Sequence, residues 1–142
     1  ADMSIDEVMT MLNKHSGSEG ICGKSDSRDI EDGIKAGDEL CILAQEMYAR
    51  RIANYVAMYN NELNGADVIV LTAGIGENSK DTRKDIIEHI ASLGVKLDEE
   101  KNNFRSEFRL ISTEDSKIPV YVIPTNEEVV IARETMAVAK LS

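Results

Sequence analysis

The chain has 142 residues, of which 16 are basic and 26 are acidic, giving a formal net charge of −10. This length, with 42% hydrophobic residues, supports a folded domain and excludes global disorder. So acidic a surface repels phosphate backbones and anionic lipid head groups, which argues against nucleic acid or a membrane surface as the main partner. No run of about 18 apolar residues is present, so no membrane span is expected.

A helix is predicted near the start of the chain. Ser4 and Glu7 have the spacing of a capping box, in which each side chain bonds to the backbone of the other residue. One face then carries apolar residues at helical spacing: Ile5, Val8, Met9 and Leu12. We expect Gly17 and Gly20 to end this helix, and residues 16–29, rich in Gly, Ser and Asp, to form a loop.

A long helix and a short strand are predicted next. The helix has apolar residues at steps of three and four: Cys41, Ala44, Tyr48, Ile52, Tyr55, Tyr59 and Leu63. Its end is expected at Asn64 and Gly65, residue types that favour a helix C-terminus. The unbroken apolar run of residues 68–71 (VIVL) predicts a central strand that is covered on both faces.

After this strand, residues 72–79 (TAGIGENS) are expected to form a turn, and Asn78 or Ser79 to cap the helix that follows. That helix has apolar residues along one face: Ile86, Ile87, Ile90 and Leu93. We expect it to stop at Gly94, and the charged residues 95–105 to form a loop or short turns.

Two strands and a helix complete the prediction. Phe108 and Leu110 indicate a minor strand at an edge of the sheet, and residues 120–123 (VYVI) indicate a core strand. The last helix is expected to begin with a capping box between Thr125 and Glu128. It is expected to bury four residues: Val129, Ala132, Met136 and Ala139.

The predicted order is helix, helix, strand, helix, strand, strand, helix, which places the chain in the α/β class. Its sheet of two or three strands packed with helices is narrow for an α/β domain, whose strands need neighbours on both sides. We therefore expect the chain to be a piece of a longer polypeptide that supplies the other strands.

The first candidate site is the strand-to-helix turn between Gly74 and Ser79. Glycine lets a backbone approach a ligand closely, and the N–H groups at a helix start favour an anion. Ligands of open α/β sheets bind at the carboxyl ends of strands, where this turn is predicted to lie. The pattern is not the dinucleotide fingerprint GxGxxG, because Ser79 occupies the position of the third glycine. A tight turn that uses glycine only for packing is the alternative.

The second candidate site lies in the predicted loop, at Asp26 and Arg28. A guanidinium offers a fixed fork of donors to a ribose, a base or a phosphate, whereas a solvated loop pair is the alternative. The nearby residues 23–25 (GKS) match the end of a phosphate-binding P-loop. However, Ser18 stands where that motif needs glycine, and a helix rather than a strand is predicted before it, so we do not expect a P-loop.

The third candidate is Glu127, at the start of the last predicted helix. Its neighbour Glu128 has the capping position three residues after Thr125, whereas Glu127 does not and could hold Mg²⁺ directly or through water. The cysteines and histidines are isolated from one another, so we expect no zinc site and two reduced thiols in a cytoplasmic protein: Cys22, Cys41, His15 and His89.

Three stretches together resemble the acetate kinase family. They are residues 68–79 (VIVLTAGIGENS), residues 118–128 (IPVYVIPTNEE) and residues 26–29 (DSRD). The resemblance extends over essentially the whole chain and is to the C-terminal part of the family. It implies the superfamily of actin, sugar kinases and heat-shock-chaperone ATPases, in which two ribonuclease-H-like lobes surround a nucleotide cleft. Residues 1–142 would then be a nucleotide-binding part, with the preceding strands and the first lobe outside them.

The resemblance also implies residue roles. The residues that would wrap the adenosine end of ATP or ADP are Gly74, Ile75, Gly76, Glu77 and Asn78. Asp26, Ser27 and Arg28 would help to hold the nucleotide, and Glu127 would be the acid linked to Mg²⁺.

The reaction implied is reversible transfer of the γ-phosphoryl group of ATP to acetate, which gives acetyl phosphate and ADP. The substrate-side groups of the family would precede Ala1, so the chain alone is expected to be inactive. The resemblance implies a homodimer for the full-length enzyme. Propionate kinase is the nearest alternative, and a non-catalytic nucleotide-binding module is the alternative from a different class.

Overall fold

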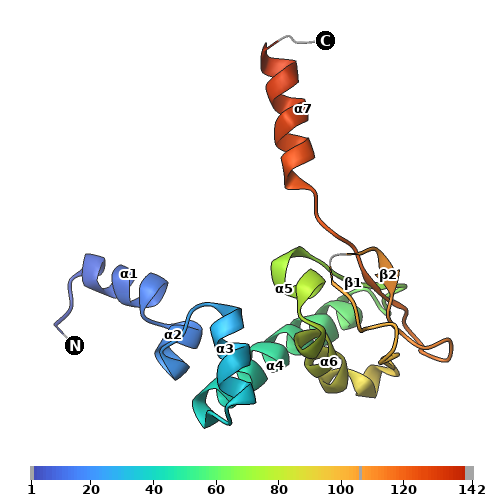
Figure 1. Cartoon of the computed structure of the whole chain (residues 1–142), viewed down its shortest axis with the longest axis horizontal. Helices are drawn as coiled ribbons and strands as arrows, with labels where there is room; N and C mark the ends of the chain where they lie inside the picture. The colour runs from blue at the N-terminus through green and yellow to red at the C-terminus, as the bar shows by residue number, and fades with distance from the viewer. Residues whose placement is uncertain (1, 106, 140–142) are drawn as a thin grey trace.

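A three-stranded sheet lies to the right in Figure 1, with most of the helices to its left. The computed structural model describes residues 2–105 and 107–139. Strand β3 (Val120–Val122) lies in the middle of the sheet, parallel to β1 (Ile69–Leu71) and antiparallel to β2 (Arg109–Leu110). The expected mixed α/β structure with two or three strands is confirmed, as is the minor strand at the edge.

The place of β1 in the sheet differs from the prediction. Among the described residues β1 pairs with β3 alone, so it is an edge strand rather than a central one. Ile69 and Leu71 are buried, whereas 43% of Val70 is exposed. Side chains alternate between the two faces of a strand, so only one face of β1 is covered. The prediction that both faces are covered is wrong for this part of the chain.

The hydrophobic core lies between the sheet and two helices. Its buried members are Ala53, Ile69, Leu71, Ile87, Ile90, Val95, Ile111, Ile118, Val120 and Val122. Helix α6 (Lys80–His89) packs against α4 (Glu39–Glu62) and turns its predicted apolar face inward. A 3-10 turn, η1 (Ala91–Leu93), follows α6 and ends at Gly94, whose φ of 81° needs a left-handed conformation that glycine adopts readily.

Helix α4 is present as predicted, and Cys41 and Ala44 of its predicted apolar face are buried, but further along the helix other residues are buried instead. Asp38 caps it, and the chain leaves it through Asn64 and Gly65, both with positive φ. The buried side chains are small: Cys41, Ala44, Ala49 and Ala53. Tyr55 and Tyr59 are 45% and 58% exposed, so the predicted apolar face is wrong in this half of the helix. Small residues let α4 approach its neighbours closely, whereas its large apolar side chains face outward.

The N-terminal third contains more helix than the sequence predicts. Helix α1 (Ile5–Lys14) has the expected capping box, but none of its side chains is buried. The predicted loop over residues 16–29 is wrong, because α2 (Gly17–Cys22) lies within it and α3 (Ser27–Lys35) begins there. The glycines expected to end α1 belong instead to α2. Short polar residues such as Asp26 favour turns and helix caps alike, and here Asp26 caps α3.

Helix α7 (Glu127–Ala139) projects away from the rest of the molecule (Figure 1). The expected capping box is wrong, because the Thr125 hydroxyl donates to Glu77 and the Asn126 side chain accepts from the Val129 N–H. The four apolar residues expected to be buried are all exposed. Within residues 2–105 and 107–139, no helix is both long and apolar enough to traverse a bilayer.

Candidate functional site

The predicted nucleotide segments meet in a pocket of about 310 Å³ between α3 and α5 (Ala73–Asn78). We call it the α3–α5 pocket; it is lined by Asp26, Ser27, Arg28, Glu31, Gly74, Ile75, Asn78, Ser79 and Arg105. Six of the eight residues expected to bind the nucleotide are among them. Folding thus brings together two segments that are far apart in the sequence.

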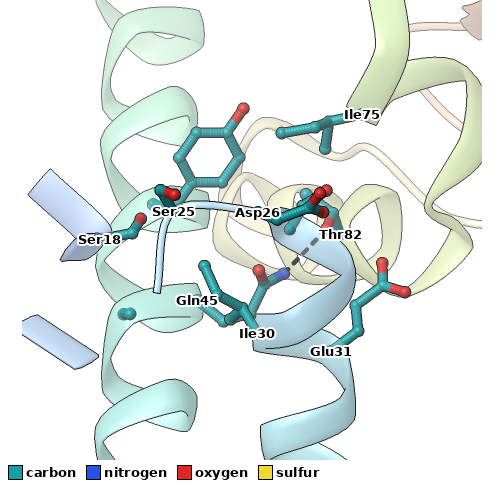
Figure 2. A pocket seen from close by; sticks show the side chains of 11 residues that line it. Ser18, Ser25, Asp26, Ile30, Glu31, Gln45, Ile75 and Thr82 are labelled. Atoms are coloured by element: carbon teal, nitrogen blue, oxygen red, sulfur yellow. Dashed lines mark hydrogen bonds between the residues drawn. The ribbon is translucent and has the colours of Figure 1, made fainter. Parts of the chain in front are cut away.

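A second pocket of about 350 Å³ adjoins the first and shares Asp26, Ser27, Glu31 and Ile75 with it. It extends from α3 toward α4, and Figure 2 shows the side chains around it. Gln45 donates its Nε2 to Thr82 Oγ1 at 3.0 Å and thereby links α4 to α6 beside this pocket. A ligand that occupied both pockets would contact α3, α4 and α5.

The expected turn after β1 is a short helix, so the predicted turn at residues 72–79 is wrong in detail. The chain leaves the strand at Thr72, whose hydroxyl donates to the Ile123 carbonyl at 2.8 Å. Ala73 then has a φ of 60°, a conformation that costs energy for any residue with a Cβ atom. Ser79 caps α6 as expected, because its hydroxyl accepts from the Thr82 N–H at 3.2 Å.

The two glycines of α5 have different surroundings. A Cβ atom placed on Gly74 would meet nothing within 4 Å, so the backbone here is open to the α3–α5 pocket. A Cβ atom on Gly76 would lie 3.3 Å from the carbonyl carbon of Leu71, which is a tight contact with β1. Packing therefore explains Gly76, whereas Gly74 leaves space that a ligand can use.

Glu77 and Gly76 do not line the α3–α5 pocket. The Glu77 side chain is only 6% exposed, and its Oε1 accepts from the Thr125 N–H at 2.7 Å and the Thr125 hydroxyl at 2.9 Å. These bonds join α5 to the segment that leads from β3 into α7. Glu77 thus holds helix α5, one wall of the α3–α5 pocket, in place without lining the pocket.

Asp26 and Arg28 form an ion pair at the pocket. Arg28 donates Nε to Asp26 Oδ1 at 3.0 Å and Nη2 to Asp26 Oδ2 at 2.6 Å. The hydrogen bonds from the Arg28 side chain and backbone lower the pKa of Asp26 to about 2. The carboxylate is therefore ionised at neutral pH and occupies much of the guanidinium fork of Arg28.

Hydrogen bonds between helices hold the pocket walls together. The Ser79 hydroxyl donates to Glu31 Oε1 at 2.7 Å and joins the start of α6 to α3. Gln45 also donates to Asp85 Oδ2 at 2.7 Å, which fastens α4 to α6. The residues beside the predicted site are thus fixed by polar contacts as well as by the core.

Arg83 is a residue that the sequence interpretation missed. Its side chain is completely buried and donates to five oxygen atoms at 2.7–3.1 Å: Gly76 O, Glu77 O, Asn102 O, Asn102 Oδ1 and Phe104 O. Burial lowers the pKa of Arg83. The signal was present, since Arg83 precedes Ile86, Ile87 and Ile90 at helical spacing and so is a charged residue on an apolar face.

Lys24 and Glu127 lie elsewhere. Lys24 donates its Nζ to Cys41 Sγ at 3.3 Å. The segment 23–25 follows helix α2, whereas a P-loop follows a strand. Glu127 is exposed at the start of α7 and does not line the α3–α5 pocket. In the described part of the chain, no three or more His, Cys, Asp or Glu side chains cluster in a way that could hold a metal ion.

The arrangement of helices around this small mixed sheet is that of the actin-like ATPase fold. It matches the crystal structure of Porphyromonas gingivalis acetate kinase with a TM-score of 0.86 at 39% identity, covering 96% of this chain and 35% of that one. The model of the acetokinase family matches residues 1–133. The chain belongs to this family.

Other relatives agree. The acetate kinase of Carboxydothermus hydrogenoformans is 49% identical over 134 residues, which are 94% of this chain and 34% of that protein. The acetate kinase of Thermosipho africanus is 51% identical over 136 residues, with the same coverage of 94% and 34%. The structure of a propionate kinase from Francisella tularensis matches with a TM-score of 0.86 at 43% identity, over 93% of this chain and 34% of that one. The chain thus spans about a third of the length of these relatives.

Proposed function

We propose that this chain is the C-terminal, nucleotide-binding part of an acetate kinase. The full enzyme would transfer the γ-phosphoryl group of ATP to acetate and release acetyl phosphate and ADP. The observation that carries the proposal is the α3–α5 pocket, which unites six predicted nucleotide-binding residues from two separate segments. Family membership adds support, because the curated relatives named above are acetate kinases.

Within this proposal the pocket walls have distinct tasks. The open backbone at Gly74 lets the nucleotide approach α5 closely, and Ile75 offers an apolar surface to its base. Asp26, Ser27 and Arg28 contact the nucleotide from α3, whereas Gly76 and Glu77 position α5 without touching the ligand.

We assign Mg²⁺ to the reaction as well, with Glu127 as its acid. A single carboxylate suits Mg²⁺, which usually takes one or two protein carboxylates and completes its shell with phosphate oxygens and water. If Mg²⁺ is bound, Glu127 would be the residue of this chain that holds it, and the ion would supply positive charge to the phosphoryl group in transfer. Glu127 is exposed and therefore free to offer its oxygens.

We place the full-length enzyme in the cytoplasm as a homodimer, as the family resemblance implies. The large apolar side chains along α4, among them Met58 and Tyr59, are exposed and offer surface for such a contact. Light scattering of the full-length protein tests the homodimer, and a monomer at micromolar concentration would contradict it.

Propionate kinase is the second candidate, favoured by the similarity to the Francisella tularensis structure. The described residues fit an acetate kinase and a propionate kinase equally, because the residues that select between acetate and propionate would lie outside them. Comparing kcat/KM for acetate and propionate in the full-length enzyme separates the two substrates.

Calorimetric titration of this chain with ADP and ATP tests the proposed function directly. We expect binding, together with protection of the Gly74 to Asn78 amides from hydrogen exchange, and no acetyl phosphate formation above background. Absence of nucleotide binding would refute the proposal. Phosphoryl transfer by the chain alone would show that catalytic groups are present in it. Binding without transfer in the full-length enzyme would leave the non-catalytic module as the explanation.

A further inference from the structure

The second pocket adjoins the α3–α5 pocket, and Ile75, to which the proposed function assigns the base of the nucleotide, lines both. Its apolar lining comes from three helices, with Ile30 on α3, Ala44 and Tyr48 on α4, and Ile75 on α5. At about 350 Å³ the second pocket has room for a flat, largely apolar base. A base that lies against Ile75 can therefore place one edge in the second pocket.

Gln45 lines the second pocket with an amide group whose orientation is fixed. Its Nε2 donates to Thr82 Oγ1 at 3.0 Å and to Asp85 Oδ2 at 2.7 Å. These two bonds use both hydrogens of the amide nitrogen, and an ionised carboxylate only accepts, so the nitrogen and the oxygen cannot exchange places. Figure 2 shows the nitrogen turned toward Thr82 and the oxygen on the side away from it.

The amide oxygen of Gln45 has no hydrogen-bond donor within the part of the chain that the structure describes. Gln45 is half-buried in the pocket wall, so a ligand that fills the pocket displaces water from this oxygen. An acceptor that loses water without gaining a donor costs free energy. The pocket therefore favours a ligand that brings a donor to Gln45.

Other polar groups of the pocket either donate as well as accept or are already engaged. The hydroxyls of Ser18 and Ser25 do both, so they do not distinguish a donor from an acceptor on a ligand. The Asp26 carboxylate is held in its ion pair, and the Glu31 carboxylate accepts from the Ser79 hydroxyl. Gln45 adds an acceptor that is fixed in orientation and that no described protein group uses.

We infer that Gln45 selects the base of the nucleotide by accepting a hydrogen bond from its exocyclic amino group; this inference rests on the proposed function. Adenine carries an amino group at C6, whereas guanine carries an oxygen there. A base oxygen that faces the Gln45 oxygen leaves two acceptors unpaired, so the site favours the adenine nucleotide. Asp85 is a positioning residue, since it holds the Gln45 amide and does not line the second pocket.

The test compares ADP with purine riboside 5′-diphosphate, an analogue that has hydrogen in place of the amino group. Both are titrated by calorimetry into the unmodified chain, Gln45→Met and the control Asn54→Met. Met has about the length of Gln without its amide, and Asn54 is an exposed residue of α4 that lines neither pocket. We expect the unmodified chain to bind ADP about fivefold more tightly than the analogue. Gln45→Met should bind the two ligands equally, and Asn54→Met should keep the difference.

A measurement on the unmodified chain covers the case in which Gln45→Met loses its fold together with the bonds between α4 and α6. Gln45 is the only glutamine of the chain, so labelling glutamine with carbon-13 gives a single NMR signal from the side-chain amide carbon. ADP should shift this signal, because the amide oxygen then accepts a hydrogen bond. The analogue should shift it much less.

The outcomes separate this inference from the proposed function. Equal binding of ADP and the analogue by the unmodified chain would overturn the inference, as would equal shifts of the Gln45 signal. A preference for ADP that persists in Gln45→Met, with both ligands weakened alike, would show a merely structural role and overturn it too. If the unmodified chain binds neither ligand, the proposed function itself fails, and the inference fails with it.

Discussion

The carboxylate of Glu77 accepts two hydrogen bonds from Thr125, one from its backbone N–H at 2.7 Å and one from its hydroxyl at 2.9 Å. Glu77 belongs to the helix after β1, and Thr125 follows β3, the parallel neighbour of β1. The carboxyl ends of both strands are thereby joined by one buried side chain. This bond fixes the exit toward α7 relative to the pocket.

Replacing Glu77 by Ala should lower the free energy of unfolding by about 2 kcal/mol, because the buried carboxylate and both of its hydrogen bonds from Thr125 are lost. Glu77→Gln keeps an acceptor oxygen and should cost less. Glu128→Ala, at an exposed position of α7, is the control and should change stability by less than about 0.5 kcal/mol. Urea denaturation measures all three, and equal losses for Ala and Gln at position 77 would argue against this role.

Gly74→Ala and Gly76→Ala should have opposite effects. At Gly74 the added methyl group meets open space, so stability should be unchanged or rise by up to about 1 kcal/mol, while ADP binding weakens. At Gly76 the methyl group is pressed against the Leu71 backbone, and stability should fall by about 1 kcal/mol or more. Thermal unfolding and calorimetric titration of both variants check this, and a stability loss at Gly74 would contradict it.

Arg83→Met should destabilise the chain by about 3 kcal/mol or more, because several buried carbonyl oxygens lose their donor at once. Arg83→Lys should be only partly better, since an ammonium group has three donors and cannot reach all five oxygens. Amides of α5 should exchange faster with solvent in both variants. Arg51→Met serves as the exposed control, and a matching loss there would show that removal of charge alone is responsible.

Titration of Asp26 should reflect its ion pair. Its pKa of about 2 lies below the ordinary value of 3.8, so the pair adds stability above pH 3.8 that is lost as the pH falls toward 2. In Arg28→Gln the pKa should rise but stay below 3.8, because the backbone N–H of residue 28 still donates. Carbon-detected NMR of the carboxyl group gives both values, and an unchanged pKa in Arg28→Gln would refute the assignment.

Strong local signals in the sequence predicted most of the core elements. The capping box at Ser4, the periodicity of α6 and the run of residues 120–123 each depend on neighbours in the chain, and each is present in the structure. The position of β1 at an edge depends on which strands pair, and the sequence of one strand does not specify that. The helices α2 and α3 were missed because Gly, Ser and Asp occur at caps as well as in loops.

The sequence predicted which segments contribute to the candidate site, but not how their residues are arranged around it. Residues 26–28 and 74–78 were expected to contribute, and six of these eight line one pocket. A Cβ atom on Gly76 would press against Leu71, whereas one on Gly74 would not. This difference is set by the way α5 follows the strand, and the spacing of the two glycines in the sequence does not reveal it. Arg105 lines the pocket through long-range contacts: its own hydrogen bond to the Asn78 carbonyl oxygen, and the bonds of Arg83 to the backbone of Asn102 and Phe104.

The five hydrogen bonds of Arg83 differ in how far they depend on the amino-acid type of the acceptor residue. Four of the acceptors are backbone oxygens, which every amino acid provides, and only Asn102 contributes a side-chain oxygen. The acceptors at Gly76, Glu77 and Phe104 do not depend on which side chain those residues carry, whereas no other residue type offers the five donors of the guanidinium. The side chains that this contact requires are therefore Arg83 and Asn102 alone, and the other residues that supply acceptors can differ while the backbone keeps its path.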